Sequence, residues 1–354
     1  MRRGAIVITS IAMAIAAEPA GAQSARQVSA ADSGRAYVWI DGSYQSVGLP
    51  SVGNFGVQGL LPATTTPGGS EKHDPRLNGY GINGGIGYVF APGVFSPLWG
   101  SNVRIELSGN YVRADGTSFA ERAPVTNVNL TALPLTGVAF GITGCGGATC
   151  VTRSSLSSDY TAWNIDLKAK SDFRSGAWTV SPSIAIVGGR ADTSQHLAQQ
   201  TFLDGAFLPL VGYDMNAALK WTDVGAKLGL ETRYEFANGL NAGLIGSAGL
   251  VHRAASMSAD SSILLGVPVP RLSAVQDGRS TVPLLLNLEA RVTARVMPNV
   301  TAKGFVGLNY DSDVPGLEAP QSLAFVSTGI PARIKFDAAT SYYAGGGLTV
   351  SFGP

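Results

Sequence analysis

Apolar and charged residues alternate strictly in several stretches of the chain, and the stretch WNIDLKAKSDFR, residues 163–174, shows this most clearly. Trp163, Ile165 and Leu167 occupy one set of alternate positions, while Asp166 and Lys168 occupy the other. A period of two residues indicates a β-strand, because successive side chains point to opposite faces. A strand of a soluble sandwich buries its apolar face, whereas a strand of a membrane barrel turns that face to lipid and encloses its polar face. The rest of the chain has to separate these two interpretations.

Ten segments carry this alternation, so the chain is predicted to be all-β. They span about 35 to 47, 79 to 90, 103 to 114, 159 to 174, 178 to 192, 221 to 236, 240 to 255, 281 to 297, 300 to 311 and 341 to 352. Boundaries read from such patterns carry an error of about 2 to 4 residues.

The connections between the segments differ in length in a regular way. Short turns (SGA after Arg174, ANG after Phe236 and PN after Met297) and a medium turn, APGVFSPLWGSN, alternate with longer segments that are read as loops. The predicted loops cover residues 48–78, 115–158, 193–220, 256–280 and 312–340. This alternation is typical of a transmembrane barrel, in which every second connection is short. We predict an antiparallel up-and-down transmembrane β-barrel of about 10 strands, or 12 if the segment 115–158 holds another hairpin.

The charged faces of the segments are predicted to line the barrel interior, because Arg or Lys facing lipid at mid-depth costs about 2–4 kcal/mol. The predicted lumen-lining residues are Arg104, Glu106, Asp166, Lys168, Lys170, Asp172, Asp223, Lys227, Glu231, Arg233, Glu289, Arg291, Arg295 and Lys303. Acids and bases nearly balance in this set. Two interpretations stay open: the charges pair across the lumen as a polar core, or they line a narrow pore for small hydrophilic solutes.

Glycines and aromatic residues add two further expectations. Gly81, Gly85 and Gly87 on the second segment, with Gly345 and Gly347 on the last, predict either a less filled side of the lumen near the closing seam or positions of strand twist and close packing. Three aromatic pairs stand ten residues apart on apolar faces, at 80 and 90, 163 and 173, and 342 and 352. Ten steps of ~3.3 Å at a tilt of ~40° rise about 25 Å, which is the height of a lipid-facing band between its aromatic girdles.

Composition and the chain ends agree with an exported membrane protein. Charged residues make up 14% of the chain, and the formal net charge of +1 indicates no nucleic acid partner. Two arginines, an apolar run and the small residues Ala20 and Ala22 predict a signal peptide over 1–22, with a linker over 23–34 and the barrel over 35–354. No later run of 18 apolar residues occurs, so no transmembrane helix is predicted. The expected location is the cell outer membrane.

Few residues suggest chemistry. Cys145 and Cys150 are expected to close a small disulfide loop, since an exported chain favours pairing and two thiolates fall short of a zinc site. GYGINGG, from Gly79, matches a dinucleotide fingerprint but opens a strand and precedes no helix, so it is discounted. No cofactor, metal ligand or catalytic residue is predicted.

With its signal peptide, amphipathic strands and a last strand SYYAGGGLTVSF, the chain resembles Gram-negative outer-membrane β-barrel proteins of the porin-like and autotransporter types. The resemblance implies that Phe352 serves as the signal read by the barrel-assembly machinery, although Gly353 and Pro354 follow it. It also implies outer-membrane lipid as a partner.

The function expected first is non-enzymatic: a narrow porin-like channel for small solutes, or a structural component of the envelope. A surface adhesin that binds a partner through its extracellular loops is the alternative, since long loops without function are uncommon. Omptin proteases resemble the chain in strand number and carry acidic residues and a His at their rim. His73, His196 and His252 are expected in loops or at outer strand ends, without an omptin signature around them.

Overall fold

The computed structural model describes most of the chain after the predicted signal peptide and linker. The described residues are 34–53, 56–60, 72–91, 102–121, 125–126, 129–133, 135–137, 140–144, 149–203, 206–236, 239–265, 267–322 and 329–352. The predicted signal peptide, 1–22, and residues 23–33 of the predicted linker lie outside them.

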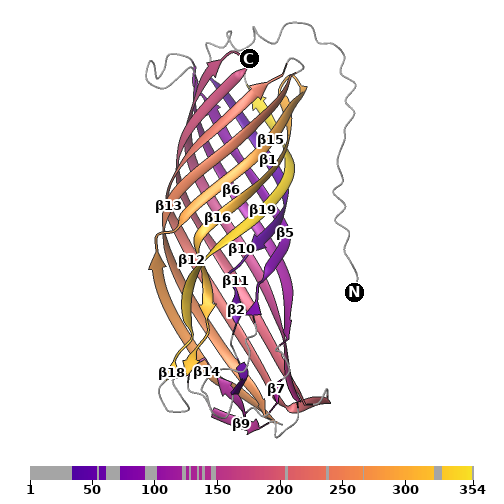
Figure 1. The fold of residues 1–354 in the computed structure, drawn as a ribbon. Helices are drawn as coiled ribbons and strands as arrows, with labels where there is room; N and C mark the ends of the chain where they lie inside the picture. The colour runs from indigo at the N-terminus through magenta and orange to yellow at the C-terminus, as the bar shows by residue number, and fades with distance from the viewer. Residues whose placement is uncertain are drawn as a thin grey trace.

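Ten strands form one closed antiparallel ring, which confirms the predicted barrel and its strand number (Figure 1). In ring order they are β1 (Arg35–Gly48), β5 (Arg76–Val89), β6 (Asn102–Glu121), β10 (Thr149–Ser175), β11 (Trp178–Leu203), β12 (Ala206–Glu235), β13 (Leu240–Leu265), β15 (Leu284–Met297), β16 (Val300–Glu318) and β19 (Arg333–Phe352). β1 pairs with β19, from Ala36 opposite Phe352 to Ser46 opposite Tyr342, and so closes the ring. β14 (Val267–Thr281) pairs with β13 beyond the end of β15.

The remaining strands are short. They are β2 (Val52–Gly53), β3 (Gly56–Leu60), β4 (Lys72–His73), β7 (Val125–Thr126), β8 (Asn129–Leu133), β9 (Phe140–Gly144), β17 (Gln321–Ser322) and β18 (Gly329–Ile330). β2 pairs with β4, β17 pairs with β18, and β3, β8 and β9 form a small sheet. All of them lie toward the end of the barrel that is opposite the chain's C-terminus (Figure 1). We call the end with the C-terminus and the turns β10–β11, β12–β13 and β15–β16 the turn end, and the other the distal end.

The prediction of long loops at the distal end was wrong for most of their length. Segment 193–220 is a hairpin in which β11 runs to Leu203 and β12 starts at Ala206. Segment 256–280 is another, with β13 ending at Leu265 and β14 starting at Val267. β6, β10, β16 and β19 likewise extend into segments 115–158 and 312–340. The alternation of connection lengths therefore reflects long strand extensions at one end of the barrel.

The alternation pattern does not predict these extensions, because the apolar residues change from the outward to the inward face in the middle of a strand. On β12 the exposed positions Val224, Leu228 and Leu230 are apolar and even-numbered. Between Tyr213 and Trp221 the buried apolar residues are odd-numbered, as with Met215 and Leu219. The backbone continues without a shift in register against β13, so the inward face passes from charged to apolar. A period-two pattern that changes phase reads as the end of a strand.

Apolar side chains form a belt around the outside of the turn-end half. Ile40, Ile86 and Leu228 are each more than half exposed, as an apolar surface facing lipid requires. Tyr80, Trp163 and Tyr342 stand on the outside at the distal edge of the belt. Phe173 and Phe352 are exposed at the turn end, while Phe90 packs edge-on against Tyr88 with ring centroids 5.0 Å apart. None of the described residues forms a helix long and apolar enough to cross a bilayer.

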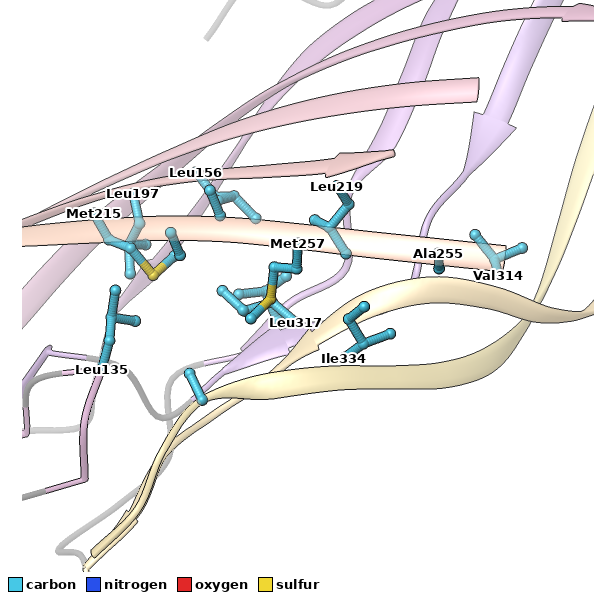
Figure 2. Packing of buried hydrophobic residues seen from close by; sticks show 14 of the residues in the cluster. Leu135, Leu156, Leu197, Met215, Leu219, Ala255, Met257, Val314, Leu317 and Ile334 are labelled. Atoms are coloured by element: carbon cyan, nitrogen blue, oxygen red, sulfur yellow. The ribbon is translucent and has the colours of Figure 1, made fainter. Parts of the chain in front are cut away.

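The distal half encloses an apolar core. Leu156, Leu197, Met215, Leu219 and Met257 project inward from β10, β11, β12 and β13. The described residues 312–322 and 329–340, which include the distal parts of β16 and β19, pack against them through Val314, Leu317, Ala332 and Ile334 (Figure 2). We call these two described stretches together the inner hairpin. The barrel thus has a polar interior within the belt and a hydrophobic interior beyond it.

Candidate functional site

The charged interior of the belt contains one ion-pair cluster around Lys170. Its ammonium lies 3.2 Å from Glu106 on β6 and 3.2 Å from Glu231 on β12. The Tyr37 hydroxyl donates a 2.6 Å hydrogen bond to Glu106. Arg104 pairs with Asp172 at 2.5 Å, and the Ser181 hydroxyl donates to the same carboxylate. These contacts connect five strands, β1, β6, β10, β11 and β12.

A second cluster lies near the closing seam. Lys303 on β16 pairs with Asp41 on β1 at 2.8 Å, and both side chains are less than one-tenth exposed. Arg291 pairs with Glu289 at 2.6 Å, and the Tyr343 hydroxyl donates to Glu289 at 3.1 Å. Lys303 also lies 5.3 Å from the centre of the Trp39 ring, which adds a cation–π contact.

These contacts are those of side chains on the concave face of the wall. Lys170 and Glu231 stand on strands separated by β11, and Lys303 and Asp41 on strands separated by β19. Enclosed side chains reach over an intervening strand most easily where the wall curves toward them. The predicted residues Arg104, Glu106, Lys170, Asp172, Glu231, Glu289, Arg291 and Lys303 are therefore brought together in pairs.

The other predicted lumen residues are arranged differently. Asp223 pairs with Arg253 at 2.7 Å. Asp166, Lys168, Lys227, Arg233 and Arg295 have no oppositely charged side chain within 4.0 Å in the described part of the chain. One buried oxygen of Asp166 also lacks a hydrogen-bond partner there. Contact between these residues and a permeating solute stays a prediction.

The glycine-rich side of the lumen is covered by aromatic rings. A Cβ atom at Gly87 would lie 2.2 Å from the Tyr37 ring, and one at Gly85 would lie 2.7 Å from the Trp39 ring. Of the two interpretations of these glycines, close packing holds at Gly85 and Gly87 and a less filled lumen does not. Glycine there makes room for a ring from the neighbouring strand, a use of strand glycine for close packing.

Arg253 links the charged interior to the apolar core, and sequence reasoning missed it. Its side chain is 2% exposed, and its guanidinium donates four hydrogen bonds. Asp223 on β12 accepts two of them at 2.7 Å, and Asp311 on β16 accepts one at 3.1 Å and also lies 2.8 Å from Nη2 as an ion-pair partner. The fourth goes to the Asp313 carbonyl at 2.8 Å. The guanidinium lies 5.7 Å from the centre of the Trp221 ring.

The position of Arg253 could have been read from the phase of β13 alone. Val251, Arg253, Ala255 and Met257 share one set of alternate positions, and all are buried. An arginine within an apolar inward row is costly unless carboxylates pair with it. The predicted segment ends at residue 255, so the sequence prediction does not include the continuation of this row to Met257.

The histidines occupy three different environments. His73 is buried, and its Nδ1 and Nε2 atoms lie 3.0 and 2.9 Å from the hydroxyls of Ser118 and Ser154. Burial lowers the pKa of His73 below its usual value. His196 is exposed on β11 beside Asp214 at 3.9 Å, and His252 is exposed on β13. His196 thus lies within a strand extension and not in the loop that was predicted.

Other predicted features have separate outcomes. Cys145 lies outside the described residues, so the disulfide with Cys150 stays a prediction. Phe352 ends β19 with its side chain 52% exposed, and its role in assembly also stays a prediction. Among the described residues, no three His, Cys, Asp or Glu side chains are grouped as a possible metal site.

Comparison with known proteins identifies no family. No protein-family model matches the chain, and no curated protein does. Among solved structures, the outer membrane protease OmpT from Escherichia coli is 10% identical and has a TM-score of 0.45, with 90% of this chain and 97% of that chain covered. A Pseudomonas aeruginosa FadL homologue is 12% identical over 90% of both chains, with a TM-score of 0.25. An anion-selective porin from Comamonas acidovorans is 8% identical and has a TM-score of 0.17, with 90% of this chain and 99% of that chain covered.

Proposed function

We propose that this protein is a closed barrel of the outer membrane, a structural envelope component that does not conduct solutes in its resting state. Its turn end faces the periplasm and its distal end faces the exterior. This choice keeps the polar-core interpretation of the lumen and sets aside an open porin-like channel.

The observation that carries the proposal is the packed apolar core of the distal half. A solute entering from outside would have to cross a region where Leu156, Met215, Leu219 and Leu317 are at most 1% exposed. Interiors packed to this degree leave few voids larger than a water molecule. Within the belt, the paired charges of the Lys170 and Lys303 clusters further fill the interior.

Planar-bilayer recording of the refolded full chain tests the proposal. We expect no conductance steps above the baseline at moderate voltage. Folding must be checked in the same sample, because misfolded protein is also silent; resistance to unfolding by detergent before heating provides that check. Regular steps from the folded wild-type protein would overturn the proposal in favour of an open porin-like channel.

Surface binding is a second candidate function, and the length of the distal half favours it. The part of β12 before Val224 extends about 45 Å beyond the belt, at ~3.3 Å per residue and a tilt of ~40°. Its outward positions, such as Asp214, Asn216 and Lys220, are polar and exposed. Such a stalk would hold its tip well above the lipid. Adhesion of cells that produce the protein, compared with cells that lack it, tests this candidate.

A further inference from the structure

The inner hairpin is held to the wall in an unusual way. β16 pairs with β15 as far as Asp311, and beyond this residue β16 pairs only with β19. The β16–β19 ladder shifts register between Asp311 and Val314, which marks a bulge. Among the described residues, no ladder joins the hairpin to β13 or β14, although β14 lies next in the wall. The hairpin thus leaves the wall at Ser312 and Asp313.

The hairpin lies inside the curved wall formed by β10 to β14. Four successive residues, Val314 to Leu317, are buried, so both faces of this strand are covered. Its apolar side chains point toward Met257 and Leu219 of the wall in Figure 2. Pro50 packs on its other side, where a Cβ atom at Gly316 would lie 2.6 Å away. A strand in this position obstructs the passage that the wall would otherwise enclose.

Arg253 fastens the root of the hairpin. The guanidinium donates hydrogen bonds to Asp311 and to the Asp313 carbonyl on β16, and also to Asp223 on the wall. The Thr281 hydroxyl and the Leu284 N–H add hydrogen bonds to Asp313 and Ser312. Further along, the Ile334 N–H donates to Asp277 of β14 at 2.8 Å. Side-chain contacts, and not strand pairing, therefore decide whether the hairpin stays in place.

We propose that the inner hairpin is a movable lid, latched by Arg253, and that its release turns the closed barrel into a pore for small ions and hydrophilic solutes. The hinge is the bulge at Ser312 and Asp313. Release leaves the ten-stranded ring intact, because every ring ladder within the belt is independent of the hairpin. The charged lumen then opens to the exterior, with Lys168 and Lys227 available to passing anions. This inference rests on the resting state being closed.

Two variants test the lid in planar bilayers. The first replaces residues 314–336 by a two-residue Asn-Gly turn, which removes most of the hairpin and keeps the β16–β19 ladder within the belt, from Val300 to Asp311. The second combines Arg253→Met with Asp223→Asn and Asp311→Asn, so that no buried charge is left unpaired. We expect both to conduct, with opening events at least about tenfold more frequent than in the wild type. Arg153→Met, which breaks an exposed ion pair with Glu121 on the outer wall, is the matched control and should remain silent.

The route through the charged lumen has its own readout. In the barrel without the hairpin, Lys227→Glu should shift the reversal potential in a salt gradient toward cation selectivity, and Leu228→Gln on the outward face should not. Silence of the hairpin deletion, in protein that keeps the heat-modifiable mobility of a folded barrel, would overturn the lid. Conduction by the wild type would instead overturn the closed resting state, so the two failures are distinguishable.

Discussion

The pair of Asp41 and Lys303 illustrates how single charges stabilise this barrel. Both side chains are less than one-tenth exposed, so removing one leaves the other buried without its partner. Lys303→Met should destabilise the folded barrel by about 3–5 kcal/mol, and the double variant with Asp41→Asn should recover most of that loss. Unfolding in denaturant from detergent micelles measures both.

An exposed pair provides the control for this prediction. Lys72 and Asp74 lie 3.0 Å apart but are both more than half exposed. Lys72→Met should therefore change the stability by no more than about 1 kcal/mol. Equal losses at Lys303 and Lys72 would contradict the idea that burial decides the cost.

His73 makes the stability of the distal half depend on pH. Burial between Ser118 and Ser154 lowers its pKa, so the folded protein holds the neutral ring while the unfolded chain takes up a proton near pH ~6.5. The stabilisation is complete above that pH and is lost as the pH falls below it. We expect the unfolding free energy to fall between about pH 7 and pH 5.

The variant His73→Leu isolates this effect. It should be less stable than the wild type at pH 7.5, since it removes the ring that contacts the buried Ser154 hydroxyl and the partly buried Ser118 hydroxyl, but its stability should change less over the same pH range. His252→Ala removes an exposed ring and should keep the wild-type pH dependence. A decline of the same slope in all three proteins would assign the effect to other groups.

At the scale of single strands, Gly87 of β5 leaves no room for a larger side chain. A side chain at Gly87 would collide with the Tyr37 ring, whose hydroxyl donates to Glu106. Gly87→Val should destabilise the barrel by about 1–3 kcal/mol, because overpacking displaces the ring and leaves a buried carboxylate short of a donor. Gly42→Val is the matched control, since no atom lies within 4 Å of a Cβ placed there.

The sequence predicts the strands of the belt well and their extensions poorly, for a physical reason visible in β12. Residues 213–221, YDMNAALKW, alternate as strictly as residues 224–230 do. Their apolar members are odd-numbered and inward, because the surroundings of the outer wall change from lipid to water. An alternation with even-numbered apolar residues therefore begins only near residue 221, and the sequence predicts residues 193–220 as a loop.

At the scale of the whole molecule, the sequence likewise predicts one part of the candidate site and not the other. The charges of the belt were predicted from alternation alone, and many of them form ion pairs in the structure. Arg253 and the inner hairpin were not predicted, because their roles depend on contacts between β12, β13 and β16 that no local pattern encodes. The obstruction of the barrel interior by the inner hairpin therefore depends on tertiary contacts.

The change of surroundings along the outer wall leads to a prediction for the whole molecule. Ala290 lies at the centre of the belt on β15, with Leu288 and Val292 exposed on either side, whereas Ala254 is exposed on β13 beyond the belt. Ala290→Arg should cost about 2–4 kcal/mol of folding free energy in a bilayer, because the guanidinium would face hydrocarbon at mid-depth. Ala254→Arg meets water and headgroups and should cost less than about 1 kcal/mol. Folding titrations into lipid vesicles measure the difference, and equal costs at the two positions would mean that the exposed apolar belt does not face lipid.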